Sequence, residues 1–400
     1  MKLDFLEPVT REGPWASVYA TTGPPDEASA ERRELVWREL CRSLEEQGAD
    51  ERTVGAVREE LDRAGPEAGQ RGLALFAADG RVAVTCHLDR APGVPSALWA
   101  ELPRVTPLLD PARREPVCLV ARVDRSGADY RTYGTGTGAG TAARTGKDAG
   151  ADADAGERQG SVDGRDWPLH SAASGDWSAI HFEAAVENTW QENAALTARE
   201  LAGVCRESGA QLIMLAGGAR ECHAVREQLP EELREITMIS GHGGRAAGAE
   251  TALLAADVEA ARLEIAARHT EAVLDRFRAG RDDSGRHVTS VEGVPAVTDA
   301  ARQHRVDALL INLAGADTGR EVWLGDEPDQ LAVRRTEAAA APGTAQPRPV
   351  RADDALVLCA TTTGAEAVMV PGDRSDGGPA GGIGAILRWP RSEPEATADR

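Results

Sequence analysis

Short runs of apolar residues alternate along this chain with longer segments of helical periodicity. The two longest runs, Leu212–Ala216 and Ala308–Ile311, have the length of strands buried inside a sheet. No stretch approaches the ~20 apolar residues that a helix needs to cross a bilayer. Strands that alternate with amphipathic helices are typical of an α/β fold, so we predict this fold class.

The pattern divides the chain into three blocks, and the first covers residues 1–115. Residues 27–64 are highly charged and carry leucines and valines at helical spacing, which predicts helix up to the stop at Gly65-Pro66. Residues 72–87 predict two short strands joined by a turn at 78–81. We therefore expect an N-terminal α+β domain.

The second block, residues 116–243, opens with a predicted hairpin. A buried strand over 117–124 is followed by a turn and a second strand over 128–133. Residues 134–164 are then mostly Gly, Ala, Thr and Asp, with almost no large apolar side chain. A segment of this composition cannot bury enough apolar surface to compensate for the conformational entropy lost on folding, so we predict a disordered insertion.

Regular structure resumes after this insertion. Apolar residues at three- and four-residue steps predict a long helix over 178–208, which Gly209 ends. A strand, a helix and a strand are predicted next, over 211–216, 219–229 and 235–240. The second block is therefore expected to be a central α/β domain.

The third block, residues 244–392, has the same alternation. The predicted elements are a long helix over 250–279, a short helix over 294–304 and a strand over 308–313. A polar loop over 336–349, a helix from 353, a strand over 365–370 and a final strand that ends at 389 follow. We expect a C-terminal α/β domain, with residues 393–400 as a tail.

The charge of the chain limits its partners. Its 400 residues include 65 acidic and 45 basic side chains, for a formal net charge of −20. Because neutralising phosphates needs a surplus of cations, we expect no DNA partner, although one domain can still present a basic face. Only Lys2 and Lys147 are lysines, so contacts with RNA would be made by arginine.

The cysteines and the N-terminus indicate a location. The six cysteines are scattered and form no CxxC pair, which suits reduced core thiols better than disulfides or a zinc site. The first ten residues mix charged and apolar side chains and lack the apolar region of a signal peptide. We expect a cytoplasmic protein with no membrane partner.

Motifs that would indicate an enzyme are absent or weak. The chain has no HExxH and no GxSxG. A dinucleotide-type spacing at Gly138, Gly140 and Ala143 lies in low-complexity sequence, with no strand before it and no helix after it. Cys222 and His223 are consecutive on a predicted helix and so do not face each other. We predict no catalytic residue, no cofactor and no metal.

Asp124 and Asp129 flank the predicted hairpin and allow two interpretations. Two carboxylates near a strand end could hold a magnesium ion in a nuclease-like site. Asp124-Arg125-Ser126-Gly127 is also an ordinary turn sequence, and we favour this second interpretation.

The C-terminal segment carries the most informative motif. It reads Gly381, Gly382, Ile383, Gly384, Ala385, Ile386, Leu387, Arg388, Trp389. This closely resembles the Gly-Gly-Ile-Gly-Gly-Ile-Leu-Arg-Tyr segment near the end of archaeo-eukaryotic class-I peptide release factors. A local interpretation is compatible with it: the glycines allow a tight turn, and the aliphatic residues fill a core.

The rest of the chain resembles the same family in order. Residues 13–19, Gly-Pro-Trp-Ala-Ser-Val-Tyr, and residues 68–72 resemble the actinobacterial branch of its bacterial relatives. The resemblance implies a three-domain release-factor-like architecture. Its central domain would be RNase H-like, and its C-terminal α/β domain would have the fold of kink-turn-binding ribosomal proteins.

Two functional motifs of the family are missing. Release factors carry Gly-Gly-Gln in the loop before the long helix, where it helps to place the water that cleaves peptidyl-tRNA. Here residues 169–177 read Leu-His-Ser-Ala-Ala-Ser-Gly-Asp-Trp, with one glycine and no glutamine. Gly69-Gln70 lies in the first domain and is no substitute, and the codon-reading Asn-Ile-Lys-Ser loop is also absent.

A factor that keeps the family shape without these motifs can still occupy the ribosomal A site. The resemblance to the Balon-type hibernation factors of this family implies binding to idle or stalled ribosomes, with ribosomal RNA and elongation factor Tu as partners. The alternatives are a peptidyl-tRNA hydrolase that uses His170 or Asp176 to position water, and a metal-dependent nuclease that uses Asp124 and Asp129.

The loop before the long helix is the expected ribosome contact, through His170, Ser174, Gly175, Asp176 and Trp177. Trp177 can stack on a base, and Asp176 can accept hydrogen bonds from base amino groups. The local alternative is that Asp176 or Ser178 caps the long helix, a role that does not exclude contact with RNA.

Overall fold

The structure of the chain is a computed structural model. It describes residues 3–11, 13–22, 27–64, 72–88, 91–109, 116–133, 158–164, 176–245, 251–281, 288–341, 346–372 and 377–390. The chain forms two compact units. Of the described residues, those between 116 and 266 form the central unit, and those before residue 110 and after residue 266 form the terminal unit. Both units are mixed α/β, in agreement with the predicted fold class.

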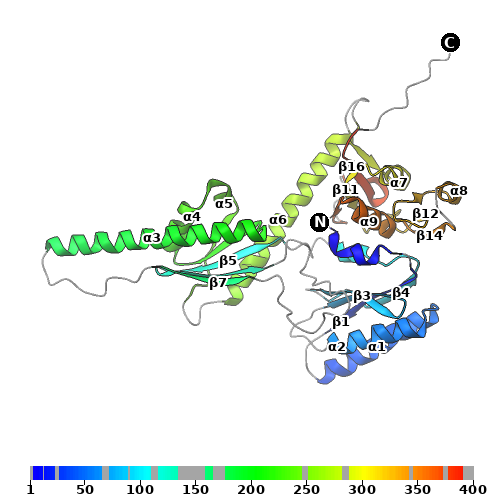
Figure 1. The fold of residues 1–400 in the computed structure, drawn as a ribbon, viewed down its shortest axis with the longest axis horizontal. Coiled ribbons are helices and arrows are strands. Elements are labelled where there is room, and N and C mark those ends of the chain that lie inside the picture. Colours follow the sequence, from blue (N-terminus) through cyan, green and yellow to red (C-terminus); the bar gives the residue numbers. More distant parts are fainter. Residues whose placement is uncertain are drawn as a thin grey trace, which may run out of the picture. The chain divides into compact units, whose positions relative to one another are not determined.

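The central unit is built on one five-stranded sheet of order β7-β6-β5-β8-β9 (Figure 1). β5, β6 and β7 pair antiparallel, whereas β5, β8 and β9 pair parallel. The strands are β5 Cys118–Val123, β6 Gly127–Tyr133, β7 Gln159–Asp163, β8 Leu212–Gly217 and β9 Thr237–Ser240. The predicted hairpin and the predicted strands at 211–216 and 235–240 are confirmed.

Helices cover both faces of this sheet. α3 (Asp176–Ser208) and α4 (Ala219–Gln228) bury Leu201 and Val225 against one face. The first half of α6 (Thr251–Arg281) buries Leu254 against the other face. Because both faces are covered, β5 and β8 read as near-continuous apolar runs rather than as an alternation.

Two details of the central unit differ from the predictions. β7 lies inside the segment 134–164 that we expected to be disordered, because an edge strand pairs through its backbone and needs few large apolar side chains. Residues 134–157 lie outside the described residues. A short helix, α5 (Glu231–Glu235), also precedes β9, so the predicted strand begins two residues later than 235.

The N-terminal part of the terminal unit is an antiparallel sheet of order β3-β2-β1-β4. The elements in chain order are η1 Asp4–Val9, β1 Trp15–Thr21, α1 Glu27–Glu46, α2 Glu51–Ala64, β2 Gly72–Ala78, β3 Arg81–Leu88, β4 Ser96–Ala100 and η2 Thr106–Leu109. α1 and α2 pack on one face of the sheet.

The helix predicted over 27–64 is two helices. α1 ends at Glu46, and Gly48 follows in the left-handed region with φ of 92°. Asp50 then accepts a hydrogen bond from the backbone of Thr53 at 2.9 Å, which starts α2 as an N-cap. Apolar residues recur at helical spacing both before and after this break, so the sequence pattern did not predict it.

The C-terminal part of the terminal unit has a sheet of order β10-β16-β11-β15 and a smaller sheet of order β13-β12-β14. Its elements are β10 Ser290–Glu292, α7 Val294–Arg302, β11 Val306–Ile311, β12 Glu321–Leu324, β13 Leu331–Ala332, α8 Arg335–Ala339, β14 Arg348–Arg351, α9 Ala352–Thr363, β15 Glu366–Met369, η4 Ala380–Gly382 and β16 Ile383–Leu387. The predicted polar loop over 336–349 is therefore wrong in part, because it contains most of α8 and the start of β14.

Helices also cover both faces of the larger C-terminal sheet. α7 and α9 lie on one face, and the second half of α6 buries Phe277 against the other. Among the helices that the structure describes, none combines the length and apolar character required to cross a bilayer.

Candidate functional site

The predicted ribosome-contacting loop connects β7 to α3. His170, Ser174 and Gly175 lie outside the described residues. Asp176 and Trp177 are the first two residues of α3, and their side chains are likewise outside the description. Because α3 begins at Asp176, Ser178 lies inside the helix and is not its N-cap.

Within the described residues, the start of this loop at Gly164 lies close to the backbone of the β5–β6 hairpin turn. The N–H of Gly164, just after β7, donates to the carbonyl of Ser126 at 2.6 Å. A Cβ on Gly164 would clash with Oδ1 of Asn193, a buried residue of α3. Asn193 in turn donates to the carbonyl of Arg125 at 3.1 Å. Only glycine fits between the hairpin turn and α3 at this position.

Arg245 gathers three aspartates beside the start of this loop. Its guanidinium donates to Asp129 at 2.9 and 3.1 Å, to Asp163 at 3.1 Å and to Asp124 at 3.2 Å. Asp163 is the last residue of β7, so the same guanidinium connects β7 to the β5–β6 hairpin and to the segment after β9. The geometry makes this cluster an anchor for the start of the loop.

Asp124 shows the turn chemistry that we favoured. Its Oδ1 accepts from the backbone N–H of Ser126 at 2.8 Å and of Gly127 at 3.0 Å. Burial alone would raise the pKa of Asp124, but hydrogen bonds from Ser126 and the positive Arg245 outweigh it and hold the pKa below its ordinary value of 3.8. The carboxylates of the proposed nuclease site are thus paired with a guanidinium. Within the described part of the chain, no group of three or more metal-ligating side chains is placed to hold a metal ion.

A second polar cluster, which no sequence pattern predicted, lies where β9 ends. The Ser240 hydroxyl and the Nδ1 of His242 both contact one carboxylate oxygen of Asp257 on α6, the latter at 3.0 Å. These contacts lower the pKa of Asp257, with the Ser240 hydrogen bond as the larger cause. Because the hydroxyl and the imidazole both meet the carboxylate, the cluster does not have the serine–histidine–aspartate order of a hydrolase. The glycine-rich segment 241–244 after a strand was its only sequence signal.

Cys222 is fully buried on α4, and burial raises its pKa to about 11. A thiol with a raised pKa is a poor nucleophile.

The C-terminal glycine motif lies at the turn into β16. Gly381 and Gly382 have φ of 67° and 91°, a region that favours glycine. A Cβ on Gly382 would lie 2.6 Å from the carbonyl oxygen of Asn312, and one on Gly384 would lie 2.9 Å from the Phe277 ring. The other residues of the motif fill the core or tie down the end of the strand: Ile383, Ile386 and Leu387 are buried, and Arg388 donates to the carbonyl of Thr363.

Comparison with known proteins gives one family match. Residues 117–283 match the model of Bacterial archaeo-eukaryotic release factor family 2. The chain is also 27% identical over 386 residues to the uncharacterized protein Rv2629 of Mycobacterium tuberculosis strain H37Rv, and the alignment covers 95% of each protein.

Two solved structures show a weaker likeness. The archaeal translation termination factor aRF1 is 15% identical, with 95% of this chain and 94% of that chain covered and a TM-score of 0.22. A model of ribosome-bound archaeal Pelota and ABCE1 contains a chain that is 12% identical, with 98% and 96% covered and a TM-score of 0.40. At these low scores, the relationship rests on the sequence matches.

Proposed function

Because residues 117–283 match the model of Bacterial archaeo-eukaryotic release factor family 2, we propose that the chain is a ribosome-binding translation factor. It would occupy the A site of idle or stalled ribosomes during dormancy or stress. It would neither read stop codons nor use Gly-Gly-Gln to hydrolyse peptidyl-tRNA. Ribosomal RNA is the expected partner, with elongation factor Tu as a second one.

The observation that carries this proposal is the loop between β7 and α3. In release factors this loop carries Gly-Gly-Gln, whereas residues 169–177 here contain one glycine and no glutamine. The strand order 3-2-1-4-5 of the central sheet, counted along the chain, supports the RNase H-like assignment of this domain. Asp163 and Gly164 tie the start of the loop to the sheet, which suits a loop that must present side chains to RNA.

Co-sedimentation with vacant and with translating bacterial ribosomes tests the proposal, with released peptide assayed in the same fractions. We expect binding to vacant ribosomes without peptide release. We also expect binding to weaken as salt rises, because arginine–phosphate contacts release counterions. Failure to bind either ribosome at low salt would overturn the proposed function.

A pair of tryptophan variants tests the role of the loop. Trp177→Ala should weaken ribosome binding about tenfold, since stacking on a base contributes roughly 1–3 kcal/mol. Trp389→Ala removes an exposed tryptophan from the terminal unit and should leave binding unchanged. Equal losses of ribosome affinity in the two variants would contradict a specific role of Trp177 in ribosome binding.

The peptidyl-tRNA hydrolase is the second candidate, because His170 and Asp176 are present in the same loop. It requires binding with peptide release, and His170→Ala or Asp176→Asn would then abolish release without loss of binding. Binding without release on translating ribosomes would exclude this candidate.

A further inference from the structure

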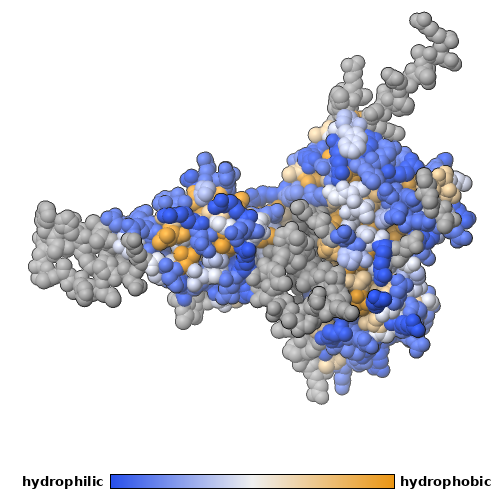
Figure 2. All heavy atoms as spheres, viewed as in Figure 1, coloured by the Kyte–Doolittle hydropathy of each residue, from blue (hydrophilic) through white to orange (hydrophobic). Residues whose placement is uncertain are grey.

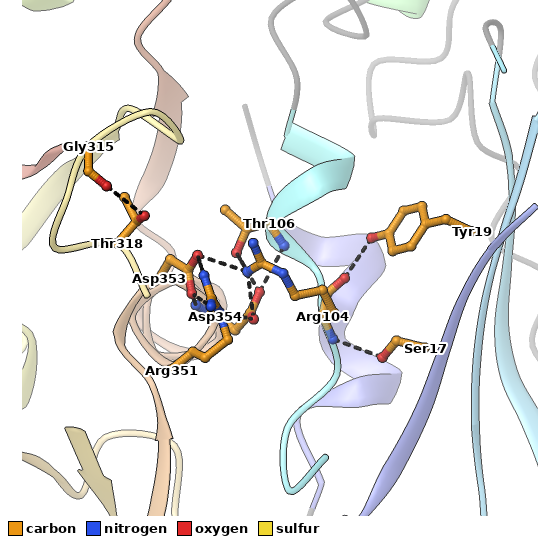
Figure 3. Close-up of polar contacts among 9 residues, drawn as sticks. All are labelled: Ser17, Tyr19, Arg104, Thr106, Gly315, Thr318, Arg351, Asp353 and Asp354. Atoms are coloured by element: carbon orange, nitrogen blue, oxygen red, sulfur yellow. Dashed lines mark hydrogen bonds and ion pairs between the residues drawn. The ribbon is translucent and has the colours of Figure 1, made fainter. Parts of the chain in front are cut away.

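A buried ionic cluster in the terminal unit joins two segments that are about 250 residues apart in the sequence (Figure 3). Its centre is Arg104, which lies between β4 and η2. Two residues of β1 fix the backbone of Arg104. The Ser17 hydroxyl accepts from its N–H at 2.9 Å, and the Tyr19 hydroxyl donates to its carbonyl at 2.6 Å. The N-terminal sheet therefore positions Arg104.

The side chain of Arg104 reaches the start of α9. Its Nη1 contacts Oδ2 of Asp353 and Oδ2 of Asp354, both at 2.8 Å. Thr106 donates its backbone N–H to Oδ1 of Asp354 at 3.0 Å and its hydroxyl to the same oxygen. Arg351 completes the cluster with bonds of 2.8 and 3.1 Å to Asp353. Two guanidinium groups thus balance two carboxylates.

The cluster is shielded from water. The side chains of Asp353, Asp354 and Arg104 are 0%, 4% and 21% exposed. Burial and the neighbouring charge of Asp353 raise the pKa of Asp354, although Arg104 and Thr106 oppose this. Without Arg104, Asp354 would keep the Thr106 hydrogen bonds and a longer 3.8 Å contact with Nε of Arg351, and losing the closer cation beside a buried carboxylate is costly.

Apolar packing surrounds these ion pairs on both sides. One continuous core contains Leu6 of η1, Phe76 of β2 and Leu356 of α9. α9 contacts both η1 and η2. The face of the N-terminal sheet that α1 and α2 leave uncovered is therefore buried in a core shared with the C-terminal helices.

We propose that Arg104 locks the N-terminal sheet onto α9, so that residues 3–109 and 288–390 form one cooperative body. The N-terminal part is then not an independent module, because one face of its sheet is buried in a core shared with the C-terminal part. In any binding event the two parts move together. This inference does not depend on the proposed function.

Hydrogen–deuterium exchange on the full-length chain tests the lock. Arg104→Met keeps a long unbranched side chain at this position and removes the positive charge. We expect exchange in β1 and β2 and in α9 to accelerate together by about a hundredfold, because breaking a buried ion pair destabilises both partners. Arg42→Met is the matched control, since Arg42 forms exposed ion pairs within α1 and should change neither region.

A milder change keeps the test valid if Arg104→Met does not fold. Thr106→Val removes only the hydroxyl that donates to Asp354, and it should accelerate exchange in both regions by about tenfold. Adding Asp354→Asn to Arg104→Met should restore part of the protection, because the buried charge is removed with its partner. Acceleration confined to β1 and β2, with α9 unchanged, would overturn the proposal.

Discussion

Gly384 illustrates how one residue of the C-terminal motif is constrained by its neighbours. A Cβ there would lie 2.7 Å from the Cβ of Pro379 and 2.9 Å from the Phe277 ring. Packing alone therefore accounts for the glycine at this position of the motif.

We expect Gly384→Ala to lower the free energy of unfolding by about 1–3 kcal/mol, because the ring and the proline must shift. Gly55→Ala is the matched control in the same unit. Gly55 lies in α2, and a Cβ added to it would meet no neighbouring side chain within 4 Å, so this change should stabilise the chain by about 1 kcal/mol. Urea denaturation measures both changes, and equal destabilisation by both would contradict the packing argument.

Asp124 contributes stability through its ionised form. Its pKa lies below 3.8 in the folded chain, so the contribution is present above about pH 3.8 and is lost as the pH falls through the lowered value. Asp124→Asn should cost about 1 kcal/mol at pH 6, since the carboxylate is partly exposed and screened. Denaturant unfolding at pH 6 and pH 3 checks this, and an unchanged difference at pH 3 would contradict it.

At the scale of elements, the central sheet depends on contacts between segments that follow different strands. Arg245 after β9 binds Asp163 at the end of β7 and the aspartates of the β5–β6 hairpin. These contacts connect the edge strand β7, which has little apolar surface of its own, to the rest of the sheet.

Arg245→Met should loosen this edge, because three aspartates then face one another without a cation. We expect a loss of about 1–2 kcal/mol, limited by the exposure of the aspartates, and faster hydrogen exchange over residues 159–164. Arg199→Met on the exposed side of α3 is the control. Unchanged exchange in β7 would show that Arg245 does not anchor it.

At the scale of the whole molecule, the chain forms two compact units. Hydrophilic side chains cover most of the described surface on the face in Figure 2, with small apolar patches among them, as a net charge of −20 suggests. Each unit has apolar cores of its own.

Two cooperative units predict separate responses to mutation. In differential scanning calorimetry, Arg245→Met should lower the transition of the central unit, whereas Gly384→Ala should lower that of the terminal unit. If both variants shift one common transition equally, the chain unfolds as a single cooperative body.

Periodicity alone was sufficient for the elements with a strong local pattern. The long helices at 176–208 and 251–281 and the strands at 118–123, 212–217 and 306–311 lie within a few residues of their predicted positions. Their apolar residues recur at the spacing of a helix or form runs of strand length, and burial on both faces of a sheet explains those runs.

Tertiary structure decided what no local pattern could. β7 has almost no apolar signal and exists because β6 and Arg245 pair with it. Arg104 and Asp354 look like ordinary surface charges in the sequence, and only the fold brings them together across about 250 residues. Local periodicity reports which side of an element is buried, whereas pairing between distant segments depends on the three-dimensional packing of the chain.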